Sequence, residues 1–245
     1  MLRKQLSYAT FTDVGDREIN EDSLCAMERD GKYCFAVCDG LGGHGMGDAA
    51  SRLVVEVFQE MFEKTEDMSS FLPQAIQASQ DILMAEQKRL DVSHKMKTTV
   101  AAMVSDGKRA YIGHVGDSRV YVFRHNKVLR RTLDHSIPQM LVLTREIKEE
   151  EIRNHPDRNV LLQSVGTEWE EPMYELMRPV PLWRCQGFLL CSDGFWELID
   201  EEKMCALLRE SASPEEWLRR MAAVVKENGT DREMDNYSAT AVWCT

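Results

Sequence analysis

Short apolar runs separated by turn residues dominate much of the chain. The runs Ser23–Met27 and Tyr33–Cys38 flank an Asp-Gly pair at positions 30 and 31, which predicts a β-hairpin. Four further runs form a meander between residues 98 and 133, and its short connections favour antiparallel neighbours throughout. These runs are Thr99–Val104, Ala110–Val115, Val120–Phe123 and Val128–Leu133. A last apolar run, Ser238–Cys244, predicts a strand at the end of the chain.

Helical periodicity lies between and after these β regions. Asp48–Lys64 carries an apolar stripe at i, i+3 and i+4 spacing, and Phe71–Leu90 combines apolar positions with good helix formers. Two more helices are predicted over Glu201–Glu210 and Pro214–Glu227, the second with Ser213 as N-cap. Strands and helices in segregated blocks favour an α+β layered sandwich over a repeated βαβ unit.

Residues 136–172 break this pattern. Charges cluster at positions 145–151, and the stretch has the look of short helices without a strong apolar face. We interpret it as an excursion from the sheet, so the expectation is one domain spanning residues 1–245.

Composition narrows the functional classes. The chain has 245 residues, 43% of them apolar, and a net charge of −11, which argues against a nucleic-acid-binding surface. Its seven cysteines are scattered without a CxxC pair, which is typical of buried thiols in a reducing compartment. No apolar stretch approaches about 18 residues and no signal peptide is evident. The expectation is a cytoplasmic protein with no membrane or nucleic-acid partner.

Acidic residues recur at the rims of the predicted strands. A lone Asp beside Gly most often makes a turn. Two of these residues, Asp39 and Asp193, follow similar hydrophobic runs, and the loop after Asp39 is richer in glycine than a turn requires. Oxygen ligands from separate strands suit Mg²⁺ or Mn²⁺, and a pair of such ions can hold a phosphoryl group and activate water. The five candidates are Asp22, Asp39, Asp117, Asp193 and Asp235.

Six motifs in order resemble the metal-dependent protein phosphatases of type 2C, in particular their bacterial branch. The match runs from about Ser7 to Thr245, and residues 155–160 and 166–167 resemble the flap subdomain of that branch. The motifs are Gly15-x-Arg17-x-x-Asn20-Glu21-Asp22, Val37-x-Asp39-Gly40-x-Gly42-Gly43, Gly116-Asp117-Ser118-Arg119, Leu133-Asp134-His135-Ser136, Ser192-Asp193-Gly194 and Asp235-Asn236.

The resemblance implies a four-layer α-β-β-α sandwich, two central antiparallel sheets flanked by helices, with a small flap subdomain. It also implies two Mn²⁺ or Mg²⁺ ions at one end, with a third, looser ion. Asp39 would bridge the two ions, the Gly40 carbonyl would bind one of them, and Asp193 and Asp235 would hold the other. Asp22 resembles an acid that acts directly or through metal-bound water. Asp117 resembles a ligand of the third ion, shared with Asp193.

The implied activity is hydrolysis of phosphoserine and phosphothreonine in proteins by direct attack of a metal-bridging water. Arg17 resembles the phosphate clamp, a role that suits a planar bidentate donor. Phosphorylated proteins would be the substrates, and a Ser/Thr kinase would be the opposing enzyme. No Cys-x5-Arg nucleophile loop of the tyrosine phosphatases is present.

Some positions depart from the family pattern. Leu41 stands where many eukaryotic relatives carry a His assigned as general acid, so His44 or a metal-bound water are the candidates for that role. Gln163 stands in the flap where bacterial relatives often have Arg. His114 and His135 are expected to be structural, satisfied by backbone groups or neighbouring carboxylates.

Two other functions are weighed. The run from Gly40 to Gly45 formally matches the dinucleotide-binding pattern G-x-G-x-x-G, but hairpin-connected strands and the adjacent Asp39 argue against it. The second alternative is a catalytically inactive, phosphatase-like domain that regulates a binding partner. Retention of Asp22, Asp39, Asp193 and Asp235 favours catalysis.

Overall fold

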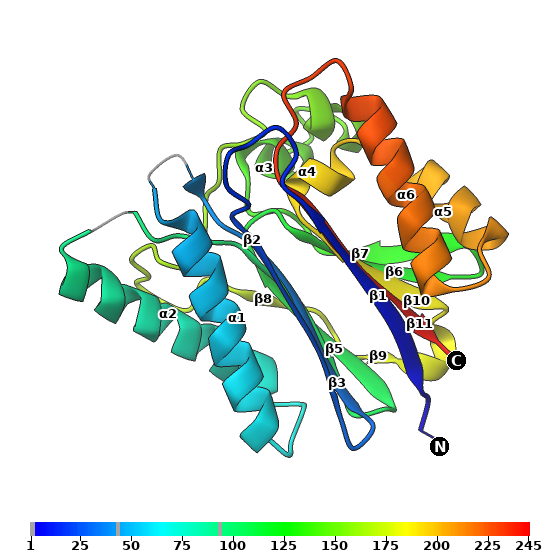
Figure 1. The fold of residues 1–245 in the computed structure, drawn as a ribbon, viewed down its shortest axis with the longest axis horizontal. Coiled ribbons are helices and arrows are strands. Elements are labelled where there is room, and N and C mark those ends of the chain that lie inside the picture. Colours follow the sequence, from blue (N-terminus) through cyan, green and yellow to red (C-terminus); the bar gives the residue numbers. More distant parts are fainter. Residues whose placement is uncertain (1–2, 43–44, 93–94) are drawn as a thin grey trace.

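Two antiparallel sheets pack face to face, and helices cover both outer faces (Figure 1). The computed structural model describes residues 3–42, 45–92 and 95–245. One sheet has the order β1-β11-β10-β6-β7; the other has β2-β3-β4-β5-β8, with β9 also paired to β5. The predicted α+β sandwich of two sheets flanked by helices is therefore confirmed.

The strands and helices have the following bounds. The strands are β1 Leu6–Asp13, β2 Asp22–Arg29, β3 Lys32–Asp39, β4 Val100–Ser105, β5 Arg109–Val115, β6 Arg119–Arg124, β7 Lys127–Arg131, β8 Glu175–Leu176, β9 Val180–Pro181, β10 Gly187–Cys191 and β11 Tyr237–Cys244. The helices are α1 Gly47–Lys64, α2 Phe71–Leu90, α3 Ile137–Leu143, α4 Asp193–Trp196, α5 Glu201–Glu210 and α6 Pro214–Gly229, with 3₁₀ turns η2 Glu149–Asn154 and η3 Leu182–Arg184.

Three apolar layers hold the sandwich together. Side chains alternate along a strand, so a central strand buried on both faces contributes to two layers. In β3, Cys34 and Ala36 pack toward α1 and α2, whereas Phe35 and Val37 pack between the sheets. In the other sheet, Leu189 of β10 belongs to the layer covered by α5 and α6. Strands β3 and β10 are thus buried on both faces. β3 ends at Asp39, and β10 ends two residues before Asp193.

Most of the predicted elements are confirmed. The hairpin is β2–β3, in which Asp22 lies opposite Asp39. The predicted helices correspond to α1, α2, α5 and α6, and Ser213 caps α6 by accepting a hydrogen bond from the Glu216 amide at 3.2 Å. The sequence analysis missed β1, an edge strand that pairs with β11 along its whole length.

The expectation that the meander pairs throughout is wrong at one connection. Strands β5 and β6 lie in different sheets, because the turn between them carries the chain from one sheet to the other. Gly116 makes this turn possible: its φ is +95°, and a Cβ there would lie 2.6 Å from the Cγ2 atom of Thr99. The crossing places Asp117 at the end of the sandwich, between the two sheets.

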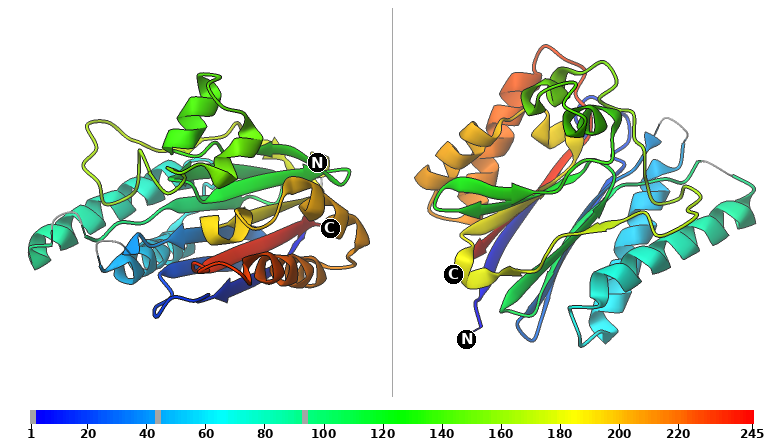
Figure 2. Two further views of the ribbon diagram at one scale, coloured as in Figure 1. Left: turned by 90° about the horizontal axis from the view of Figure 1, so that it is seen from above. Right: turned by 180° about the vertical axis from the view of Figure 1, so that it is seen from behind.

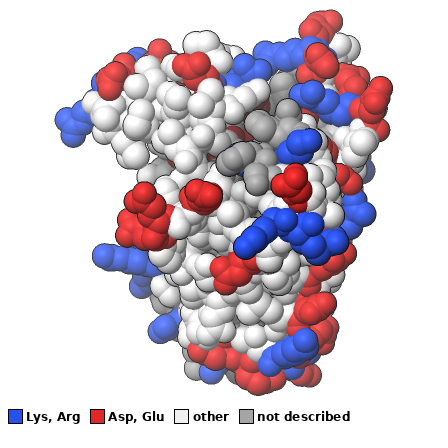
Figure 3. All heavy atoms as spheres, turned by 90° about the vertical axis from the view of Figure 1, so that its left-hand side faces the viewer, with Lys and Arg blue, Asp and Glu red and all other residues white. Residues whose placement is uncertain are grey.

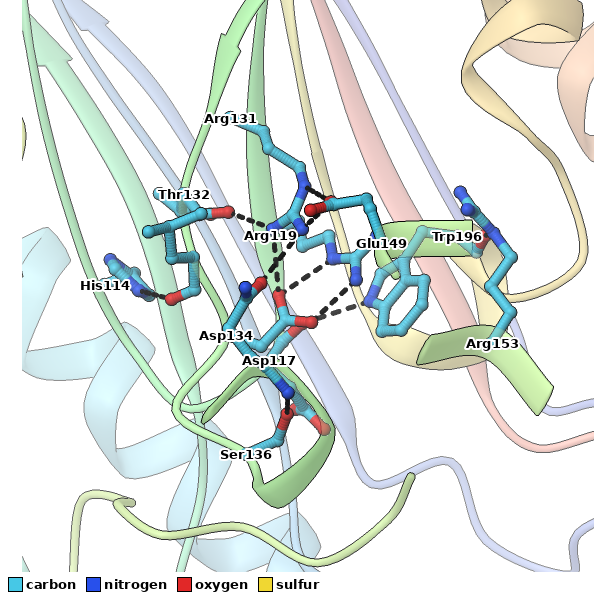
Figure 4. Close-up of polar contacts among 12 residues, drawn as sticks. His114, Asp117, Arg119, Arg131, Thr132, Asp134, Ser136, Glu149, Arg153 and Trp196 are labelled. Carbon is cyan, nitrogen blue, oxygen red and sulfur yellow. Dashed lines mark hydrogen bonds and ion pairs between the residues drawn. The ribbon is translucent and has the colours of Figure 1, made fainter. Parts of the chain in front are cut away.

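A buried ion pair lies directly behind this crossing. The Arg119 guanidinium donates two hydrogen bonds to the Asp134 carboxylate, at 2.8 and 2.6 Å, and both side chains are 1% exposed (Figure 4). The Arg119 Cζ atom also lies 3.3 Å from the centre of the Trp196 ring, and the Trp196 indole donates to the Asp117 carbonyl at 3.0 Å. The pair, together with Trp196, therefore joins β6, the segment between β7 and α3, and helix α4.

Residues 136–172, here called the flap segment, stand out from the sheets in the views of Figure 2. The segment contains α3 and η2, and it returns to the body of the molecule at β8. Arg153 of η2 donates to the carbonyl oxygens of Trp196 and Ile199, which attaches the flap segment to the region around α4.

Basic and acidic side chains of the described residues both occur on the face of the molecule that Figure 3 views. Within the described parts of the chain, no helix combines the length and the apolar character needed to cross a bilayer.

Truncation of the buried pair tests its structural role. Asp134→Ala leaves the Arg119 charge buried without its partner, so the free energy of unfolding should fall by about 3–5 kcal/mol. Urea unfolding followed by circular dichroism measures the change. Glu60→Ala, which removes an exposed partner of Lys64, is the control and should change stability by less than ~0.5 kcal/mol. A loss below ~1 kcal/mol for Asp134→Ala would contradict the assigned role.

Candidate metal centre

A cavity of about 870 Å³ opens at the end of the sandwich, beneath the flap segment. Acidic side chains from separate parts of the chain line one side, and flap residues 159–164 line the other. The acidic residues that line it are Glu18, Glu21, Asp39, Asp48, Asp117, Asp193 and Asp235.

Asp22 and Asp39 face each other across the β2–β3 pairing. Their Cα atoms are register partners, so the two carboxylates are held at the same end of the sheet. The Asp39 backbone is fixed by the two residues before β4: its amide donates to Thr99 Oγ1 at 3.0 Å, and its carbonyl accepts from the Thr98 hydroxyl at 2.8 Å. Asp22 is buried beneath the cavity; its Oδ2 accepts from Ser192 Oγ at 2.8 Å, and its Oδ1 has no partner.

Asp193, which is half-buried, and the buried Asp117 complete the cluster. Asp193 is the first residue of α4, just after β10, and its Oδ1 accepts from the Gly194 amide at 2.6 Å. Asp117 follows the Gly116 crossing and is 5% exposed. Because β3, β10 and the β5–β6 turn end together, three carboxylates that are distant in sequence surround one space.

The surroundings of four carboxylates at this site disfavour their ionised state. Burial raises the pKa of Asp22 to about 7. Burial also raises the pKa of Asp39, Asp117 and Asp193, and repulsion from neighbouring carboxylates raises each of them further. A divalent cation among them would remove this repulsion, so the donor set and the unpartnered Asp22 oxygen both fit hard cations.

Arg17 and Asp235 are paired at the cavity rim. The guanidinium donates to both carboxylate oxygens, at 3.0 and 2.9 Å, and both side chains are roughly half exposed. The sequence analysis expects Arg17 to bind phosphate and Asp235 to bind metal. The structure brings these two side chains together, in contact with each other and facing the same cavity.

Gly40 has a glycine-specific position next to Asp39. A Cβ there would lie 2.3 Å from the Gly47 carbonyl oxygen and 2.7 Å from that of Glu21, so any side chain would displace the loop. The Gly40 amide donates to the Glu21 carbonyl at 3.1 Å. This contact holds the glycine-rich loop against the start of β2.

The candidates predicted from the sequence are therefore gathered at one end of the fold. Arg17, Asp39, Gly40, Asp117, Asp193, Asp235 and the flap residue Gln163 line the cavity, and Asp22 lies beneath it. His44, the possible general acid, lies outside the described residues.

Three sets of positioning residues were missed by the sequence analysis. Ser192 links Asp22 to β11 because its hydroxyl also accepts from the Ser238 amide at 3.0 Å. Thr98 and Thr99 hold Asp39. The Asn236 side chain accepts from the Glu21 amide and donates to the carbonyls of Val14 and Ile19, which fixes the loop that carries Arg17. Ser192 and Asn236 stand within the quoted motifs, which was the available signal for them, whereas Thr98 and Thr99 lie outside every motif.

Comparison with known proteins identifies the fold family. The family model described as Protein phosphatase 2C matches residues 14–242. A serine/threonine phosphatase stp of Listeria welshimeri is 32% identical over 211 residues, which is 82% of each chain.

Solved structures agree with this assignment. Serine/threonine phosphatase Stp1 from Staphylococcus aureus superposes with a TM-score of 0.89 at 27% identity, covering 99% of this chain and 96% of that one. The catalytic domain of serine threonine protein phosphatase PstP, in complex with 2 manganese ions, gives a TM-score of 0.82 at 27% identity, with 99% of both chains covered.

Relief of carboxylate repulsion is testable without substrate. In EDTA, Asp39→Asn should raise the free energy of unfolding by ~1–2 kcal/mol, because it removes one of the mutually repelling charges. In saturating Mn²⁺ the wild-type chain should instead have the higher free energy of unfolding, because bound metal stabilises it more than it stabilises Asp39→Asn. Urea unfolding in both buffers gives the comparison, with exposed Asp231→Asn as the control. Destabilisation by Asp39→Asn in EDTA would show that this carboxylate is structural.

Proposed function

This chain belongs to the protein phosphatase 2C family, and we propose that it uses the acidic centre to hydrolyse phosphoserine and phosphothreonine in proteins. It is a protein serine/threonine phosphatase. We propose which of its residues bind the metal ions and which bind the substrate phosphate. The observation that carries it is the convergence of Asp39, Asp117 and Asp193 on one cavity, beside a half-exposed arginine.

The proposed metal ligands follow from this arrangement. Asp39, the Gly40 carbonyl, Asp193 and Asp235 would hold two Mn²⁺ or Mg²⁺ ions, and Asp117 would help to hold a third. A PstP catalytic domain with two manganese ions supports the choice of metal. Ions bound there would supply neutralisation of phosphoryl charge and activation of a water molecule, the chemistry that a phosphate monoester requires.

Arg17 orients the substrate phosphate in this proposal. Its planar guanidinium already makes a two-pronged contact with the Asp235 carboxylate, and the same geometry fits two phosphoryl oxygens. Asp235 keeps the guanidinium at the cavity rim, and a phosphate with more negative charge competes for it. Asn236 supports the arrangement because it fixes the loop that carries Arg17.

The cavity offers no thiol for covalent catalysis within the described part of the chain. None of the cysteines there lines the cavity, and burial raises the pKa of Cys38, the cysteine next to Asp39. Direct hydrolysis is therefore preferred over a phosphocysteine route. The retained carboxylates favour catalysis over the inactive regulatory alternative.

The proposed partners follow from the phosphatase activity. Phosphorylated proteins are the substrates, and a Ser/Thr kinase is the opposing enzyme. The proposed location is the cytoplasm, where its phosphoprotein substrates would be accessible.

A phosphothreonine peptide assay tests the function. The purified chain should release phosphate in Mn²⁺, lose activity in EDTA and recover when Mn²⁺ is returned. Asp39→Asn should lower kcat/KM by at least ~10²-fold, because it removes a proposed metal ligand. Metal binding by calorimetry without phosphate release from any phosphopeptide would favour the regulatory alternative.

Arginine at position 17 should matter mainly for substrate affinity. Arg17→Ala removes charge-assisted hydrogen bonds to phosphate, so KM should rise about 10–100-fold, with a smaller change in kcat. Arg17→Lys keeps the charge but loses the planar fork of donors, so its KM should lie between those of the wild type and Arg17→Ala. Steady-state kinetics on one peptide separate these effects. Equal KM values for all three proteins would remove Arg17 from substrate binding.

A further inference from the structure

Three potential metal ligands meet at the base of the flap segment, away from the acidic centre. His114 of β5 lies directly opposite Glu175 of β8, so both side chains project from the same face. The His135 ring packs against the His114 ring with centroids 4.5 Å apart, and its Nε2 lies 3.8 Å from Glu175 Oε1. In the chain as described, no other three His, Cys, Asp or Glu residues bring their donor atoms within 4.8 Å of one another.

Both histidines are buried, and each has a ring nitrogen without a partner. His114 is 1% exposed; its Nε2 donates to the Leu133 carbonyl at 2.6 Å, whereas its Nδ1 has no partner (Figure 4). His135 is 8% exposed; its Nδ1 accepts from the Gly116 amide at 3.2 Å, whereas its Nε2 has no partner. The expectation that backbone groups or carboxylates satisfy these rings holds for one nitrogen of each.

Two unpartnered buried nitrogens beside a carboxylate point to a ligand. Buried polar atoms are almost always paired, so each exception needs a physical reason. The Nε2–H of His114 is held by a carbonyl, so its unpartnered Nδ1 carries the lone pair, and His114 offers a ligand atom within 4.8 Å of those of His135 and Glu175. Metal-binding histidines are oriented in this way, by donation from their second nitrogen to a backbone carbonyl.

The chemistry of this ligand set differs from that of the acidic centre. Burial lowers the pKa of His114 and lowers that of His135 to about 4, so both rings are uncharged at neutral pH and compete little with protons. Two neutral imidazoles and one carboxylate are a known ligand combination for zinc. Carboxylate and carbonyl oxygens, by contrast, suit Mg²⁺ and Mn²⁺.

We propose that His114 Nδ1, His135 Nε2 and Glu175 bind one zinc ion, with a water molecule as the fourth ligand. Tetrahedral zinc with bonds of about 2.0–2.1 Å holds its ligand atoms about 3.4 Å apart. The 3.8 Å separation of His135 and Glu175 is close to this value. The Glu175 side chain is 62% exposed, so it is free to supply the remaining movement.

Zinc binding changes one hydrogen bond in the protein. Because Gly116 donates to His135 Nδ1, the ring proton is on Nε2; coordination through Nε2 moves that proton to Nδ1 and ends the contact with Gly116. Gly116 precedes Asp117, so the zinc ion and the acidic centre are linked through this turn. The Gly116 amide is therefore a reporter of zinc binding that does not depend on activity.

The position of the site suggests its role. His135 immediately precedes the flap segment and Glu175 follows it shortly after its end, while His114 belongs to the central sheet. A shared zinc ion closes the loop between these residues and fastens both ends of the flap segment to β5. The proposed effect is restricted opening of the flap segment over the cavity.

Zinc titration in saturating Mg²⁺ tests the site, since Mg²⁺ competes for the all-oxygen ligands. Equilibrium dialysis should find one zinc ion fewer per chain for Glu175→Gln than for the wild type, or an affinity at least tenfold lower. Glu171→Gln removes the same charge from an exposed residue of the adjacent segment and is the matched control, with wild-type binding expected. Glu175 is exposed, so the substitution should leave the fold intact.

Two spectroscopic measurements separate this site from the acidic centre. Co²⁺ in place of zinc should give the visible spectrum of a tetrahedral site with nitrogen ligands in the wild type, and Glu175→Gln or His114→Gln should weaken it. The Gly116 amide resonance should shift with zinc in the wild type. Equal zinc binding by Glu175→Gln and the wild type, or a wild-type chain that binds no zinc in Mg²⁺, would overturn the proposal and assign the unpartnered nitrogens to a bridging water.

Discussion

Mutual repulsion among buried carboxylates is the constraint on which the rest of this structure depends. Asp22, Asp39, Asp117 and Asp193 are held at one end of the sandwich, where burial and neighbouring charge raise the pKa of each. Such an arrangement opposes folding until a cation is bound, so its stability must come from elsewhere. The three apolar layers supply it, and the strands that form them, β3 and β10, are those that lead into Asp39 and Asp193.

The polar contacts behind the carboxylates show how the scaffold resists this repulsion. Arg119 is fully buried, paired with Asp134 and packed on Trp196, whose indole in turn holds the Asp117 carbonyl. Arg119 lowers the pKa of Asp117 less than its partner Asp134 raises it, so this ion pair holds the Asp117 backbone in place without neutralising its carboxylate. The backbone at Asp117 is therefore held by groups that do not line the cavity, which supports the acidic centre from behind.

Features set by local pattern could be predicted from the sequence, whereas those set by packing between the sheets could not. Helices α1 and α6 follow from periodicity and capping, and the Asp22–Asp39 pairing follows from the hairpin register. The β5–β6 crossing was missed because a short connection between apolar runs has the same pattern whether the strands pair or change sheets. The contact between Arg17 and Asp235, 218 residues apart, was missed for a similar reason: it depends on the packing of two loops. Motif order indicated which residues converge, but not which of them touch.

Two sites of different ligand chemistry in one chain would solve a problem of metal selectivity. Zinc binds most nitrogen and oxygen ligand sets more tightly than manganese does, so selectivity depends on ligand type and geometry. Hard carboxylates around an open cavity suit ions that retain water and bind phosphate, whereas paired imidazoles at the base of the flap segment suit zinc. Because the Gly116 turn lies between His135 and Asp117, an ion at one site changes the backbone that supports the other. Coupling of this kind is reciprocal, so manganese at the acidic centre should in turn alter zinc affinity at the flap base.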